Sequence, residues 1–143
     1  MFSDDGCIEK VLSLIGNRRI MRLGTFSGRW PHVVPLAFVV DGRNIYFESK
    51  YDSKKIRNIL NHNKVAALFD EYSEVGDTPQ YSGVLIFGTA SILEFGSQEF
   101  LRARELLYRK YPYFEKHFPI LPNTGRTIVK IEVKKLITWS YPQ

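Results

Sequence analysis

Phe47-Glu48-Ser49-Lys50-Tyr51-Asp52-Ser53-Lys54-Lys55 is the stretch in which a strand runs into a helix. The β-rich segment 44–49 ends here, and the apolar spacing of residues 56–60 begins an amphipathic helix. Asp52 or Ser53 occupies the N-cap position, and two lysines follow in the first turn. A helix N-terminus already carries about half a positive charge, so two further cations there are unfavourable without an anion.

Two interpretations of this junction are open. In the first, free backbone N–H groups, a hydroxyl and the two ammonium groups together bind a phosphate. In the second, Asp52 caps the helix and both lysine side chains extend into water. Short motifs alone do not decide between such alternatives.

The composition is that of one globular domain. The chain has 143 residues, of which 44% are hydrophobic and 14% aromatic, so we expect a single domain over residues 1–143. No apolar run approaches the roughly 20 residues that span a bilayer, and residues 1–5 lack the basic start and apolar core of a signal peptide. The single cysteine, Cys7, fits a reducing compartment. We therefore expect a cytoplasmic protein with no membrane partner.

The net charge of +5 favours anionic partners, which include phosphorylated cofactors as well as nucleic acids. The basic residues do not form one block. Along residues 126–134 the charged residues all stand at even-numbered positions, so in a strand their side chains would share one face, as on the solvated side of a sheet. We therefore expect no nucleic-acid partner, and a nucleic-acid-binding barrel stays as an alternative that lacks the usual RNA-binding aromatic motif.

The hydrophobic pattern predicts six strands, three helices and a long polar loop. The predicted strands are 19–26, 31–40, 44–49, 65–70, 83–93 and 126–140, and the predicted helices are 3–15, 53–62 and 97–111. Residues 71–82 contain Gly76, Pro79 and three acids and are predicted as a surface loop. The aromatic residues between 108 and 118 either pack the last helix onto the sheet or roof a substrate pocket.

These elements suggest an antiparallel barrel with helical additions. Strands 31–40 and 83–93 carry apolar side chains on both faces, which predicts that both strands are buried on both sides. The barrel interior accounts for one face, and three modest helices cannot cover all of the other. We therefore expect a homodimer.

In order and spacing, these segments resemble the pyridoxamine 5′-phosphate oxidase-like, FMN-binding split-barrel superfamily, from about Arg19 to Trp139. The segments that carry the resemblance are the strand 32–38, the junction 47–55, Arg57-Asn58, the strand 83–93 and the final strand 131–139, which ends in Trp. The resemblance implies a mainly β protein: a six-stranded antiparallel Greek-key split barrel with about three peripheral helices. It also implies a homodimer with two flavins, each bound between the subunits.

The resemblance also implies the site residues. Lys54 and Lys55 would hold the flavin phosphate, and Glu48, Ser49 and Ser53 belong to the same junction. The flavin ring would lie along the strand formed by His32, Val33, Val34, Pro35 and Leu36, in which Pro35 offers only a carbonyl. The partner subunit would contribute Ser82 and Trp139.

The chain also departs from the family pattern. Pyridoxamine phosphate oxidases continue beyond the tryptophan with an Arg-x-His element, whereas only residues 140–143 follow Trp139 here. We therefore do not expect a true pyridoxamine phosphate oxidase. The basic pair is Lys-Lys where those oxidases have Arg-Lys, and lysine lacks the bidentate fork of arginine.

The expected function is an FMN-dependent oxidoreductase that uses a small-molecule substrate or NAD(P)H. The alternatives are a reductase that uses the deazaflavin F420 and a non-catalytic module that binds flavin or haem. No catalytic residue is assigned, since a bound flavin can carry the hydride chemistry itself. The histidines His32, His62 and His117 have no metal-binding spacing, so no metal site is expected. His32 either bonds the flavin or substrate or has a structural role.

Overall fold

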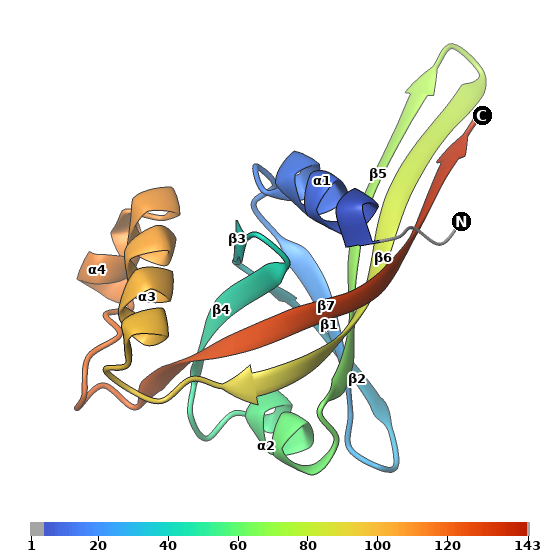
Figure 1. Cartoon of the computed structure of the whole chain (residues 1–143). Coiled ribbons are helices and arrows are strands. Elements are labelled where there is room, and N and C mark those ends of the chain that lie inside the picture. The colour runs from blue at the N-terminus through green and yellow to red at the C-terminus, as the bar shows by residue number, and fades with distance from the viewer. Residues whose placement is uncertain (1–4, 143) are drawn as a thin grey trace.

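A computed structural model describes residues 5–142 of the chain (Figure 1). The described part contains the strands β1 (Met21–Phe26), β2 (Pro31–Leu36), β3 (Val39–Asp41), β4 (Asn44–Lys50), β5 (Lys64–Val75), β6 (Thr78–Ile92) and β7 (Arg126–Tyr141). The helices are α1 (Asp5–Ile15), α2 (Lys54–Asn61), α3 (Gln98–Lys110) and α4 (Tyr113–His117). The expected start of the first helix at Ser3 lies outside the described residues.

The strands form one antiparallel sheet in the order β2-β1-β5-β6-β7-β4-β3. The sheet coils into a barrel, with α2 across one end and α1 near the other, while α3 and α4 form a lobe on the outside (Figure 1). The edge strands β2 and β3 are not hydrogen-bonded neighbours within residues 5–142, so the barrel is split. The mainly β, antiparallel split barrel expected from the sequence is confirmed.

The sheet has one strand more than expected, because the predicted strand 31–40 divides into β2 and β3. At the division, Phe38 leaves the ladder and both its backbone groups bond the Tyr111 hydroxyl instead. The expectation that this segment is buried on both faces is wrong for the protomer. Pro31, Val33 and Pro35, which alternate along β2, are exposed, and Val33 is 65% exposed.

The surface loop predicted for residues 71–82 is also wrong. Residues Glu71 to Val75 pair with Thr78 to Ser82, and a two-residue turn at Gly76-Asp77 joins them. Gly76 has φ of +64°, the left-handed value that such tight hairpin turns require. Both faces of this segment are largely exposed. Its sequence therefore lacks the alternation of apolar and polar residues that marks a half-buried strand, and for this reason a loop was predicted.

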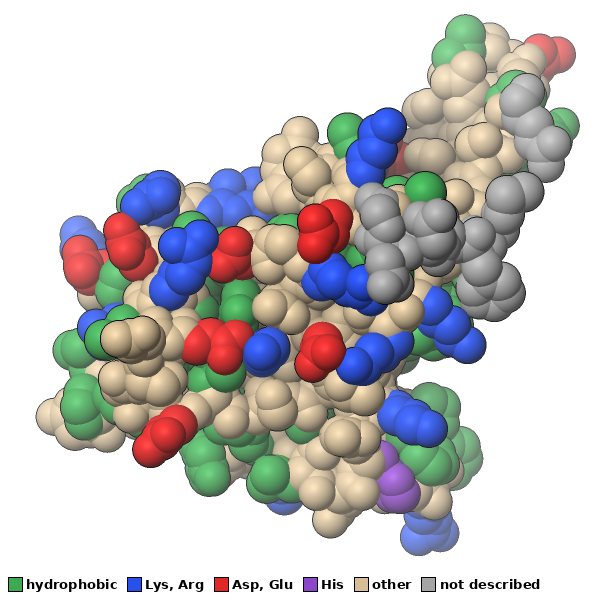
Figure 2. Space-filling model, viewed as in Figure 1, with side chains coloured by type: hydrophobic (Ala, Val, Ile, Leu, Met, Phe, Trp, Pro, Cys, Tyr) green, Lys and Arg blue, Asp and Glu red, His purple; other side chains and the backbone are tan. Residues whose placement is uncertain are grey.

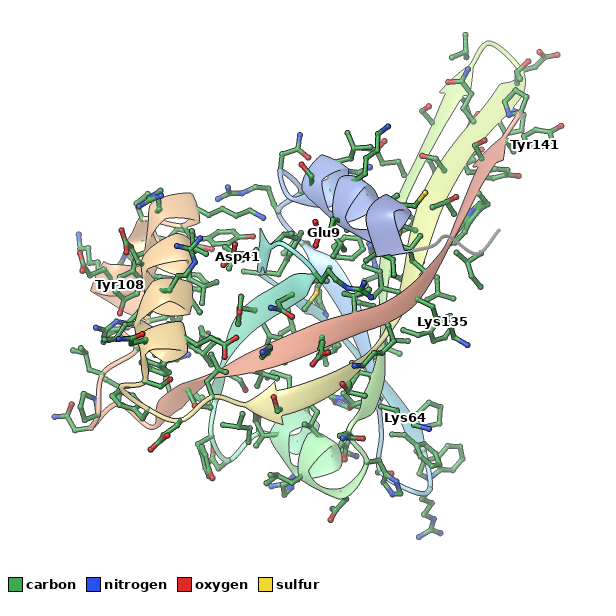
Figure 3. The ribbon with its side chains drawn as sticks, viewed as in Figure 1. Glu9, Asp41, Lys64, Tyr108, Lys135 and Tyr141 are labelled. Carbon is green, nitrogen blue, oxygen red and sulfur yellow. The ribbon has the colours of Figure 1, made fainter. Side chains whose placement is uncertain are left out.

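This hairpin and the end of β7 form an arm, residues 71–82 and 139–141, that projects away from the barrel (Figure 1). Tyr72, Tyr81 and Tyr141 line up across its three strands, with ring centroids 5.3 and 5.6 Å apart. All three rings are about half exposed, and Figure 3 shows Tyr141 at the outer end of the arm. Within the described protomer, nothing covers this aromatic row.

The core has two parts. The barrel interior is filled by side chains from the strands, such as Leu23, Phe47 and Ile86, and is closed by Leu12 of α1 and Ile56 of α2. A second cluster packs α3 and α4 onto the outer face of the sheet. The aromatic residues 108–118 belong mainly to this second cluster, so their packing role is confirmed.

Tyr111 connects three separate parts of the chain. Its buried hydroxyl accepts a hydrogen bond from the Phe38 amide at 3.2 Å and faces the carbonyl oxygens of Arg19, at 2.9 Å, and Phe38, at 3.0 Å. Because the chain leaves the ladder at Phe38, this hydroxyl replaces the missing strand partner. A buried amide without such a partner would cost free energy.

We predict that Tyr111→Phe destabilises the protein by about 2 kcal/mol, because it leaves the Phe38 amide buried and unpaired. Urea unfolding measures this change. Tyr113→Phe is the matched control, since its ring is 46% exposed and the change should stay below about 0.5 kcal/mol. Equal effects of the two substitutions would contradict the role assigned to Tyr111.

Candidate functional site

The helix α2 begins at Lys54 with Ser53 as its N-cap. Ser53 has extended backbone angles, φ −71° and ψ 159°, and its hydroxyl accepts from the Ile56 amide at 3.4 Å. The alternative that Asp52 caps the helix is therefore wrong. The two lysines occupy the first turn, which contains no acidic residue.

Ser49 and Ser53 meet across the junction, with their hydroxyl oxygens 2.9 Å apart. Ser49 is buried and donates to the carbonyl oxygen of Lys50. Each hydroxyl has one hydrogen, so Ser53 is left to donate to Ser49. Both hydroxyl hydrogens are thus bonded within the protein, and a phosphate could receive one only if a bond to Lys50 or Ser49 were exchanged.

Two further charged residues lie at the same junction. Glu48 and Arg126 form an ion pair at 2.8 Å, and their side chains are only 14% and 17% exposed. Lys55 is half-buried beside them, whereas Lys54 is exposed. Burial lowers the pKa of Lys55; the Glu48 carboxylate opposes this shift and the Arg126 guanidinium adds to it. Lys55 therefore lies beside a carboxylate that is already paired with Arg126, and a bound anion would offset the cost of burying Lys55.

Sequence reasoning missed Arg126 and treated it as part of a solvated strand face. It reaches the junction because β4 and β7 pair, which sets Lys50 opposite Arg126 and the buried Thr127 opposite Ser49. These residues are about 76 positions from the junction along the chain. The only sequence signal was their position at the start of the last predicted strand.

A buried polar contact links α2 to the strand predicted to bind the flavin ring. The Asn58 side-chain amide donates to the Thr25 hydroxyl at 3.0 Å, and both residues are 4% exposed. Thr25 lies on β1 directly opposite His32 on β2. The helix that carries the two lysines is thereby held against the His32 end of β2.

His32 is incompletely bonded in the protomer. Its Nδ1 atom is buried and has no hydrogen-bond partner, the one such side-chain atom in residues 5–142. A buried nitrogen without a partner is costly, and in native proteins it commonly marks a missing ligand or water. Of the residues predicted for the ring, His32 therefore carries the clearest sign of a ligand.

Among residues 5–142, no strand pairs with the outer edge of β2. Alternate residues of an antiparallel edge strand point their backbone groups toward the free side. Pro31 and Pro35 have no N–H to give to β1, so these residues and Val33 between them suit the free side. There the edge offers carbonyl groups and the Val33 N–H.

Ser82 and Trp139 lie far from this junction. They are near the end of β7, where Gly83 pairs with Trp139 and Ser82 with Ser140. Trp139 lies 13 positions after Arg126 on β7, which corresponds to up to about 40 Å at 3.3 Å per residue. The indole of Trp139 lies directly on Gly83, where an added Cβ would collide with the ring. One protomer therefore does not bring Trp139 to its own junction.

The face shown in Figure 2 carries acidic and basic side chains interspersed. On β7 the cations are largely paired: Lys130 with Glu99, Lys134 with Glu132, and Arg126 at the junction. Among the described residues no helix is long and apolar enough to cross a membrane, and no three His, Cys, Asp or Glu side chains gather as metal ligands would.

Residues 8–140 match the family model described as pyridoxamine 5′-phosphate oxidase. A FAD-binding protein of Mesorhizobium loti has a similar structure, with TM-score 0.74 and 18% identity over 98% of this chain and 96% of that one. A FAD-binding protein of Mycobacterium smegmatis also has a similar structure, with TM-score 0.69 and 16% sequence identity over 99% of both chains. The haem storage protein of Vibrio cholerae is similar as well, with TM-score 0.73 and 13% sequence identity over 91% of this chain and 93% of that one. No curated protein gave a significant match.

We predict that Asn58→Ala destabilises the protein by about 2 kcal/mol, because it leaves the buried Thr25 hydroxyl without its donor. Asn61→Ala on the same helix is the control: its amide bonds the Arg57 carbonyl at an exposed position, and its loss should cost less than about 0.5 kcal/mol. Urea unfolding of both variants measures the difference. If Asn58→Ala unfolds like the wild type, the buried link between α2 and β1 is not needed.

Proposed function

The chain belongs to the pyridoxamine 5′-phosphate oxidase family, and we propose that it is a homodimeric FMN-dependent oxidoreductase. The single observation that carries this proposal is the excess of cations at the first turn of α2. Lys54 and Lys55 occupy a first turn that contains no acidic residue, and the ion pair of Glu48 and Arg126 lies beside Lys55. The fold is shared with proteins described as FAD-binding, which supports a flavin as the anion.

The flavin phosphate would bind at this first turn. A phosphate monoester carries close to two negative charges near neutral pH, which matches the charge excess there. Lys54 would contribute a mobile ammonium group and Lys55 a half-buried one. Ser49 and Ser53 lie within the same turn and would bond the phosphate by exchanging their present partners.

The flavin ring would lie against β2, over the strand His32 to Leu36. The free edge of β2 offers carbonyls and the Val33 N–H, which complement a ring edge with both donors and acceptors. The unpartnered His32 Nδ1 would bond the ring or the substrate. Asn58 would keep these two parts of the site in register by holding α2 against β1.

The second subunit would complete the site. The exposed aromatic row of the arm and the exposed apolar residues of β2 are surfaces that a partner would bury. Trp139 on β7, and Ser82 on β6 opposite Ser140, lie too far from the junction of their own chain to serve it. They would wall the site of the other protomer.

The bound flavin would supply hydride transfer at its ring, as it does in flavoproteins generally. The residues of this chain would bind the phosphate, orient the ring and exclude water. No protein acid or base is required for this role. NAD(P)H or a small reduced molecule would be the electron donor.

The F420 and haem alternatives are separated by the visible spectrum of the purified protein. Bands of oxidised flavin support the proposal, a Soret band supports haem storage as in the Vibrio cholerae protein, and a protein that refuses FMN contradicts the proposal. Oxidation of NAD(P)H by the flavin-loaded protein then separates an enzyme from a binding module.

We predict that replacing Lys54 and Lys55 together by Ala weakens FMN binding by about 3 kcal/mol or more, because two charge-assisted contacts are lost. Quenching of flavin fluorescence on titration measures the affinity. The affinity for riboflavin, which lacks the phosphate, should fall much less in the same double variant.

The matched control replaces Lys10 and Lys116 by Ala. These lysines are exposed on α1 and α4, so the change in net charge is the same but no phosphate contact is removed. The control should bind FMN as the wild type does. Equal FMN affinity of all three proteins would refute the assignment of the phosphate site.

A further inference from the structure

All the charged side chains of the arm are acidic. The arm contains Glu71, Glu74 and Asp77 and no lysine or arginine. Glu71 is paired with Arg18, whereas neither Glu74 nor Asp77 forms an ion pair within residues 5–142. Val75 lies between these two acids and is 61% exposed. The tip of the arm therefore presents one apolar side chain and two carboxylates that lack a cation.

The opposite end of the molecule has a hollow with complementary chemistry. The hollow measures about 640 Å³ and is lined by Phe26 and residues 60–64. This volume is typical of binding pockets in proteins. Phe26 and Leu60 form its apolar part and are 44% and 63% exposed, while Lys64 contributes a positive charge.

The hairpin between β1 and β2 adds a second cation beside this hollow. Its turn packs against a lining residue, since a Cβ added at Gly28 would lie 3.1 Å from the His62 Nε2 atom. Arg29 comes next in the chain, and residues 26–30 and 60–64 contain no acid. Within the described chain, neither Arg29 nor Lys64 forms an ion pair. Figure 2 shows hydrophobic and basic side chains with a histidine at this end of the molecule.

A protomer cannot bring its own arm to its own hollow. Strand β5 begins at Lys64, which lines the hollow, and ends at Val75 in the tip of the arm. Its 12 residues span about 36 Å at roughly 3.3 Å per residue step. Figure 1 accordingly shows the arm and α2 at opposite ends of the molecule. Any contact between tip and hollow must therefore join two copies of the chain.

The outer face of the sheet between these two ends is apolar. Ala66 and Leu68 of β5 pair in register with Phe87 and Leu85 of β6, and all four are half-buried. The residues between them on each strand belong to the barrel core, so these four side chains point outward. A two-fold axis across the middle of β5 would bring two such faces together. The same axis places each tip at the hollow of the other copy, because tip and hollow lie at opposite ends of one strand.

We propose that the tip of the arm docks in the hollow of a second copy, and that the contact is reciprocal. This inference rests on the homodimer of the proposed function and assigns the contact that joins its subunits. The apolar side chain of the tip contacts the apolar part of the hollow. The two carboxylates of the tip pair with the partner's Arg29 and Lys64. Complementary charge at both ends also fixes how the two copies are oriented.

Charge reversal tests this contact. The arm variant carries Glu74→Lys and Asp77→Lys, and the hollow variant carries Arg29→Glu and Lys64→Glu. In each variant alone like charges meet, so we expect the dissociation constant of the dimer to rise at least about 100-fold. Analytical ultracentrifugation without flavin measures this constant. An equal mixture of the two variants should form a heterodimer with an affinity close to that of the wild type, because opposite charges meet again at both ends.

The matched control for the arm variant is Glu94→Lys with Glu115→Lys. Both residues are exposed and lie outside the arm and the hollow, and the net charge changes by the same amount. This control should dimerise as the wild type does. A monomeric wild type would refute the homodimer together with the arm contact. A dimer that resists both reversals, or a mixture that does not recover, would overturn the arm contact alone.

Cross-linking locates the contact in the wild-type protein without any substitution. A carbodiimide joins a carboxylate directly to a lysine that it touches. Copies with light and heavy nitrogen are mixed, so that mass spectrometry distinguishes links between chains from links within one. We expect Lys64 of one isotope linked to Glu74 or Asp77 of the other. Dimers that give other links between chains but none between the arm and Lys64 would contradict the proposal.

Discussion

The concentration of positive charge at the start of α2 is the constraint on which the rest of this account depends. Ser53 caps the helix, so both lysines must lie in its first turn, where the helix dipole already disfavours cations. The β4–β7 pairing adds Arg126 to the same place. Glu48 neutralises only part of this charge. A dianion bound at this turn would stabilise the arrangement.

The second constraint is the length of β7. This strand crosses the molecule from the junction to the end of the arm (Figure 1), so residues at its two ends cannot meet within one chain. The arm is a three-stranded extension with an uncovered aromatic row. A protein that places one half of a proposed site at each end of a long strand needs a second copy to bring the halves together.

The sequence predicted local features well and failed where distant segments decide the structure. The helices α2 and α3 and the closing strand follow from spacing and capping residues, whereas the choice of Ser53 over Asp52 as the cap of α2 came from the structure. The break at Phe38 was not predictable, because it depends on a hydroxyl 73 positions away. The arm was misread since its strands are exposed on both faces, and the role of Arg126 became visible only through β-strand pairing. The expected superfamily is confirmed, whereas the ligand contacts of His32 and Trp139 stay predictions.

The measurement that tests the central claim most directly is complementation between subunits. One protomer carries Lys54→Ala and Lys55→Ala, the other carries Trp139→Ala, and mixed dimers are isolated by two different affinity tags. If each site draws its phosphate ligands from one chain and its wall from the other, the mixed dimer contains one intact site. We expect it to bind one FMN per dimer with wild-type affinity, while both parent dimers bind weakly. A mixed dimer that binds no better than its parents would contradict a site shared between two chains.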